Sequence, residues 1–273
     1  MRKTLTQALL AAFCAILARG TSAAHVEGGG VMQIASKISM WSGARTPTAK
    51  DYVQDGLVYQ LDGIENDGFG KHLARGPWRD LVSGDVWATY TGDFTATAYH
   101  AQSIDALTKS LYLAWPEAAR KVFADGIYTI EIRGKSSIGN STTTSPRSVF
   151  QTVVGANPVR IGVYNQLAFT FQIGGVNTFL GPGILGLPSD ELGRYQFDVT
   201  GWQNGTAGGF KVMNADYEKS LTNCTTGTPS QARILVNSDC DALWYAVRIY
   251  SRALTADEIA ANYAIDKERF GLT

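Results

Sequence analysis

The chain has 273 residues, and its 24 basic and 24 acidic side chains give a formal net charge of zero. Nucleic acids and anionic membranes attract strongly basic surfaces, so this balance argues against either as a partner. Glycine occurs at 29 positions, which is typical of a chain with many turns.

Residues 1–24 have the pattern of a secretory signal peptide. Arg2 and Lys3 supply a positive start, an apolar run covers residues 8–18, and small residues precede a cleavage site after Ala24. The run is shorter than the roughly 20 residues that cross a bilayer, so we expect cleavage rather than anchoring. We therefore expect a secreted or cell-surface protein with no transmembrane segment in the mature chain.

Residues 25–52 are expected to form a leader or linker, because glycines at 28–30 and the Thr-Pro-Thr sequence at 46–48 interrupt any periodicity. Residues 53–273 are expected to form one domain. Their short β-branched and aromatic runs, separated by Gly, Asn, Asp and Pro, are typical of antiparallel strands. The predicted strands are Leu57–Leu61, Val86–Tyr90, Ile127–Arg133, Val149–Val154, Val159–Val163, Leu167–Ile173, Tyr195–Val199, Phe210–Met213, Arg233–Val236 and Trp244–Tyr250.

Alternation is clearest over residues 127–133. The even-numbered side chains are apolar or aromatic, whereas Thr129, Glu131 and Arg133 share the other face. This pattern predicts one buried and one solvated face, as in the sheet of a two-layer sandwich.

Helical segments are expected at 103–109, at 117–123 and at the C-terminus. Thr255 and Glu258 have the spacing of a capping box, and cationic residues lie where the helix dipole favours them. We expect three to four turns packed on the sandwich through an apolar stripe. This stripe consists of Ile259, Ala260, Tyr263, Ala264 and Phe270.

The two flanks of the domain resemble a known family. The sequence WYAVRIYSRALTADEIAANYAIDKERFG (Trp244–Gly271), together with YVQDGLVYQLDGIENDGFG (Tyr52–Gly70) and PWRDLVSG (Pro77–Gly84), resembles laminin-G-like, concanavalin A-like jelly rolls of bacterial secreted or surface proteins. The resemblance implies an all-β, two-sheet antiparallel jelly-roll sandwich with a C-terminal helix, whose terminal strands pair in one sheet. The chain departs from the family at residues 243–245, where Leu-Trp-Tyr replaces an acidic pair.

Cys224 and Cys240 are expected to form a disulfide, because Cys14 leaves with the signal peptide and export leads to an oxidising compartment. Closing this loop would stabilise the fold by about 3 kcal/mol in the chain-entropy model. The alternative is two separate buried thiols.

No catalytic residue is predicted. A glycoside hydrolase needs two suitably placed carboxylates, but the position two after Glu131 is Arg133, which favours an ionised carboxylate over a general acid. We expect these two to form a solvated pair. His25, His72 and His100 are widely spaced and fit neither a metal site nor a triad.

No cofactor is expected, although the acidic turn Asp62–Gly68 offers oxygen ligands that suit calcium. The turn lacks the spacing of an EF-hand loop, so we favour a structural hairpin turn.

The predicted ligand-binding residues are Trp202 and Asn204, which we place among turn residues. An indole stacks on a sugar ring while an amide bonds its hydroxyl groups. Trp78, Trp87 and Trp244 are expected to be core residues, which is also the alternative for Trp202.

We therefore expect a non-catalytic extracellular binding or adhesion module that binds a glycan or a surface protein. The alternatives are a structural surface-assembly subunit without a small ligand and, more weakly, a divergent glycoside hydrolase.

Overall fold

A computed structural model describes residues 45–76, 78–86, 94–96, 100–103, 111–137, 147–153, 159–164, 168–181, 185–229, 231–234 and 242–273. One compact unit spans Thr46–Thr273, and every element below belongs to it. It begins inside the segment that we assigned to the leader. The predicted signal peptide lies outside the described residues.

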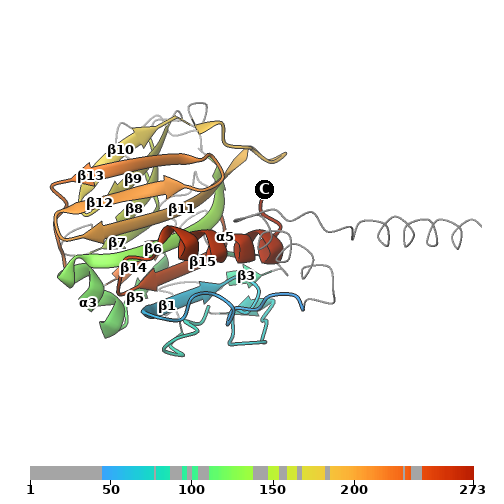
Figure 1. The fold of residues 1–273 in the computed structure, drawn as a ribbon. Helices are drawn as coiled ribbons and strands as arrows, with labels where there is room; N and C mark the ends of the chain where they lie inside the picture. The colour runs from blue at the N-terminus through green and yellow to red at the C-terminus, as the bar shows by residue number, and fades with distance from the viewer. Residues whose placement is uncertain are drawn as a thin grey trace, which may run out of the picture. The chain divides into compact units, whose positions relative to one another are not determined.

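Among the described residues, the strands form two antiparallel sheets of nine and six strands (Figure 1). The large sheet has the order β13-β12-β11-β6-β15-β4-β3-β2, and β1 also pairs with β15. Its strands are β1 (Leu57–Asp62), β2 (Arg75–Gly76), β3 (Phe94–Ala96), β4 (Ala101–Ser103), β6 (Ile127–Ser137), β11 (Arg194–Asn204), β12 (Ala207–Val212), β13 (Tyr217–Thr222) and β15 (Ala242–Tyr250).

The small sheet has the order β10-β9-β8-β7-β14-β5. Its strands are β5 (Leu111–Ala114), β7 (Arg147–Val153), β8 (Val159–Tyr164), β9 (Ala168–Ile173), β10 (Val176–Leu180) and β14 (Gln231–Ile234). The architecture is an all-β sandwich with a C-terminal helix, as the sequence predicts.

The two flanks of the domain lie side by side. β1 pairs with β15 in antiparallel register from Leu57 opposite Tyr250 to Asp62 opposite Ala246. This pairing confirms that the terminal strands share one sheet.

The core lies between the two sheets and is rich in aromatic rings. Phe171 of β9 stacks on Phe210 of β12 with ring centroids 4.9 Å apart, and Phe150 of β7 lies 6.2 Å from Trp244 of β15. Trp78 and Trp244 are fully buried, as predicted, whereas Trp87 lies outside the described residues. Such rings bury large apolar areas, so they dominate the stability of the sandwich.

Two helices are described. α3 (Glu117–Asp125) follows Pro116 and ends at Gly126, whose φ of 66° provides a left-handed C-cap. α5 (Ala256–Phe270) begins with the predicted capping box, in which the Thr255 hydroxyl accepts from Glu258 N and the Glu258 carboxylate accepts from Thr255 N. The helix predicted at 103–109 falls mostly outside the described residues, and Ser103 itself belongs to β4. No helix in the described part of the chain is long and apolar enough to span a membrane.

Candidate functional site

Where α5 lies across it, the outer face of the large sheet is polar yet buried (Figure 1). Its fully buried side chains are Gln60, Asp62, Thr129, Glu131, Arg133, Asp198, Thr200 and Arg248. The predicted solvated face of β6 is therefore wrong. Period-two alternation identifies the two faces of a strand, but it does not show whether a polar face meets water or a helix.

The helix meets this face with polar side chains as well. Its buried residues are Asn262, Asp266, Arg269 and Phe270. Of the predicted apolar stripe, Phe270 is buried and Ile259 and Tyr263 are half-buried, whereas Ala260 and Ala264 are exposed, so that part of the prediction is wrong. A polar sheet face requires hydrogen-bonding partners, and the helix supplies them.

Two guanidinium groups and two carboxylates form a closed ionic cluster under α5. Arg133 Nε donates to Asp266 Oδ2 at 2.8 Å, and Arg248 Nε donates to Glu131 Oε2 at 2.7 Å. Arg248 also donates to Asp266, and Arg133 Nη2 lies 3.4 Å from Glu131 Oε1. The Glu131–Arg133 pair is thus completely buried rather than solvated, which corrects the sequence prediction.

The pKa values of the carboxylates follow their partners. Burial alone raises the pKa of Asp266, but Arg248 and Arg133 outweigh burial and hold it below its usual value. Within the described part of the chain, Asp198 forms no such ion pair. Burial raises its pKa to about 6, and Arg133 and the hydrogen bonds from Gln196 Nε2 and Tyr263 OH offset this only in part.

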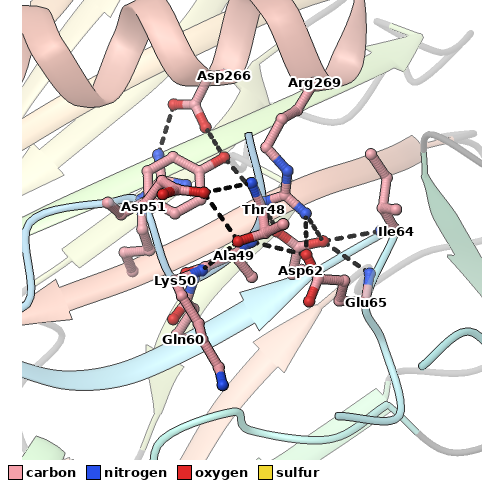
Figure 2. Close-up of polar contacts among 12 residues, drawn as sticks. Thr48, Ala49, Lys50, Asp51, Gln60, Asp62, Ile64, Glu65, Asp266 and Arg269 are labelled. Atoms are coloured by element: carbon pink, nitrogen blue, oxygen red, sulfur yellow. Dashed lines mark hydrogen bonds and ion pairs between the residues drawn. The ribbon is translucent and has the colours of Figure 1, made fainter. Parts of the chain in front are cut away.

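A second polar cluster lies under the last turn of α5 (Figure 2). Arg269 Nη2 donates to Asp62 Oδ1 at 3.0 Å and to Glu65 Oε1 at 2.9 Å. Its Nη1 lies 3.2 Å from Tyr52 OH, and Tyr52 OH donates to Asp266 Oδ1 at 2.9 Å. Tyr52, at the end of the predicted leader, therefore links the two clusters.

In the acidic turn that we considered as a calcium site, the carboxylates accept hydrogen bonds from donors of the chain itself. Asp62 Oδ1 accepts from Ile64 N at 3.0 Å and from Glu65 N at 2.8 Å. Glu65 accepts from Ala49 N at 2.7 Å and from Gly70 N at 2.6 Å. The described residues contain no group of three or more potential metal ligands. This geometry favours the structural turn over a cation loop.

Trp202 and Asn204 lie on one strand rather than in a turn. They occupy β11, opposite Gly209 and Ala207 of β12, and the turn itself is formed by residues 205–206. Gly208 and Gly209 belong to β12. Because Gly209 has no side chain, the indole of Trp202 fits against it; a Cβ on Gly209 would lie 2.4 Å from Trp202 Cζ2.

Trp202 and Asn204 project from the outer face of the sheet, because alternate residues of a strand share one side. The indole of Trp202 lies directly over the Gly209 backbone and is half-buried, while Asn204 is exposed. The structure thus places the two predicted ligand-binding residues side by side on one face.

Cys224 carries a buried free thiol whose Sγ lies 3.8 Å from the Ile173 carbonyl oxygen. Burial raises the pKa of this thiol. Cys240 lies outside the described residues. The disulfide therefore stays a prediction.

No family model and no curated protein matches the chain. Solved structures do resemble it. The binding domain of botulinum neurotoxin DC in complex with SialylT has a TM-score of 0.50 at 10% identity, covering 78% of this chain and 52% of that one. The Trypanosoma rangeli sialidase in complex with sialic acid has a TM-score of 0.48 at 15% identity, covering 83% and 34%. At such identity only the fold is shared, and the chain spans about half and a third of these two proteins.

Proposed function

We propose that the protein is a non-catalytic extracellular binding module whose ligand is a glycan. The binding surface is the outer face of the large sheet at Trp202 and Asn204. The observation that carries this proposal is the partly exposed indole of Trp202 lying on Gly209, with the exposed amide of Asn204 two residues further along the same face.

The neighbouring strands make this surface open and polar. Across the sheet, Trp202 lies opposite Gly209, and Gly209 lies opposite the exposed Ser220 of β13. Because glycine separates them, no side chain stands between the indole and the serine. A pyranose ring stacks on an indole face while hydroxyl and amide groups bond its oxygens.

The ionic cluster supports a non-catalytic role. Glycoside hydrolysis needs one carboxylate that holds a proton and a second that faces it across a substrate. Glu131 and Asp266 are each paired with both Arg133 and Arg248 and are covered by α5. Carboxylates paired in this way stay ionised, so they hold the helix on the sheet and are poor proton donors.

The structural neighbours guide the choice of ligands. The botulinum neurotoxin domain, which shares the sandwich, is a binding domain in complex with SialylT. Glycans, sialylated ones included, are therefore the first compounds to test.

A glycan array with purified protein tests the proposal. We expect binding that Trp202→Ala weakens by about tenfold, the effect of losing one aromatic stacking contact. Phe179→Ala is the matched control, because Phe179 is an aromatic residue on β10 of the other sheet with 51% exposure. Equal loss in both variants contradicts the proposal.

Two other outcomes would favour the alternatives. No detectable binding on the array, together with self-association of the protein, supports a surface-assembly subunit. Polysaccharide turnover that is lost when one carboxylate is replaced supports a hydrolase.

A further inference from the structure

A cleft lies beside the second polar cluster, at the end of α5 opposite the capping box. Its two walls are the N-terminal arm at 46–50 and the turn at 64–72, and Arg269 lies at its base. Its volume of about 540 Å³ falls in the range of small-molecule sites. None of its lining residues belongs to the Trp202 surface.

Glu65 holds the two walls together. Its Oε1 accepts from Ala49 N in the arm, and its Oε2 accepts from Gly70 N in the turn (Figure 2). Arg269 Nη2 donates to the same carboxylate at 2.9 Å. Because a buried side chain fixes both walls, the cleft is formed before any ligand arrives.

The cleft carries an excess of positive charge. Glu65 is the single acid among the lining residues that the structure describes, and it shares Arg269 with Asp62. Lys50 and Lys71 are exposed at the rim, and within the described part of the chain neither ammonium has a carboxylate within 4.0 Å. Two uncompensated cations at one opening attract an anion.

An aromatic ring completes the lining. Phe69 is 37% exposed, and Lys50 Nζ lies 4.8 Å from its ring centroid. Pro47 and Ile64 add half-buried apolar surface. A ligand with a flat apolar face and a carboxylate would satisfy both the ring and the lysines.

We propose that this cleft is a second ligand site, which takes a carboxylated sugar such as a uronic acid. The sugar ring packs on Phe69, and its carboxylate pairs with Lys50 and Lys71. The site goes beyond the glycan surface at Trp202 and does not depend on it, since Trp202→Ala leaves every residue of the cleft in place.

Calorimetric titration with glucuronic acid and with glucose tests the proposal, because the two sugars differ only by the carboxylate. We expect glucuronic acid to bind at least tenfold more tightly than glucose and to weaken as salt rises. Lys50→Gln and Lys71→Gln should each reduce its affinity by about three- to tenfold. The matched control is Lys121→Gln on α3, an exposed lysine that should leave the affinity unchanged.

Four results would overturn the proposal. Glucose binding as tightly as glucuronic acid would remove the role of the lysines. Unchanged affinity in Phe69→Ala, or full displacement by equimolar inorganic phosphate, would reduce the cleft to a general anion site. Absence of glucuronic acid binding at millimolar concentration would exclude the site, whatever the result on the glycan array.

Discussion

Arg133 Nε of β6 donates to Asp266 Oδ2 of α5 at 2.8 Å, with both side chains completely buried. The same carboxylate oxygen also accepts from Arg248 of β15. One acid on the helix therefore holds two cations of the sheet. Buried charges of this kind stabilise only while every partner is present.

Asp266→Asn should therefore reduce the free energy of unfolding by about 3–5 kcal/mol, since it leaves two buried guanidinium groups with one carboxylate fewer. Equilibrium urea unfolding followed by circular dichroism measures this change. Glu268→Gln, an exposed acid on the same helix, should change stability by no more than about 0.5 kcal/mol. Equal midpoints for both variants would show that the cluster does not hold the helix.

Asp198 predicts a pH dependence of stability in the acid range. Its pKa rises from 3.8 to about 6 on folding, mainly through burial, with Asp266 raising it and Arg133 lowering it. As pH rises, the unfolded chain loses this proton first, so stability decreases between about pH 4 and pH 6 and levels off above. The contribution of this group is about 3 kcal/mol.

Asp198→Asn tests that dependence, because an amide is almost isosteric and does not titrate. The variant should lose the decrease between pH 4 and pH 6, so its stability relative to the wild type grows over this interval. Urea unfolding at half-unit pH steps measures the difference. Parallel stability curves for the two proteins would show that folding does not shift the pKa of Asp198.

The sequence predicts the sandwich well because its signals are local. The strand at 244–250 and the capping box at 255–258 follow from alternation, β-propensity and one side-chain pair, and the pairing of the two flanks follows from the resemblance. Six described strands were not predicted, namely β2, β3, β4, β5, β10 and β13. Of these, β13 at 217–222 is mostly polar and lies at the edge of its sheet.

The polar clusters were not predictable in this way. Glu131 and Arg248 are 117 positions apart, and both look like ordinary surface residues until α5 covers them. The cleft was missed for a similar reason, because 46–52 resembles a linker and its contacts with Glu65 and Asp266 depend on the finished fold. One signal of a polar contact between helix and sheet was Arg269, because this charged residue stands beside Phe270 on the face that meets the sheet.

Gly209→Ala should disturb the Trp202 surface without a change in charge. The new Cβ would lie 2.4 Å from Trp202 Cζ2 and 2.7 Å from the Lys219 carbonyl oxygen, so the indole must move. We expect a loss of about 1–3 kcal/mol in unfolding free energy and a red shift of tryptophan emission. Ser220→Ala, on the exposed position opposite Gly209, should change neither. An unchanged emission spectrum in Gly209→Ala would mean that the indole does not lie on this glycine.

Glu65→Gln should loosen the N-terminal arm while the sandwich stays folded. A carboxylate accepts from both Ala49 N and Gly70 N, but a glutamine side chain has one acceptor oxygen and an amide nitrogen that only donates. At least one of these backbone amides then loses its acceptor, and its hydrogen exchange should accelerate by about tenfold or more. Exchange measured by NMR at Ala49 and Gly70 detects this directly. Asp67→Asn is the matched control, because Asp67 lies in the same turn, pairs with Arg79 at 3.5 Å, and among the described residues has no ion pair or side-chain hydrogen bond to the arm. Equal exchange at both amides in Glu65→Gln and wild type would show that Glu65 does not fasten the arm to the turn.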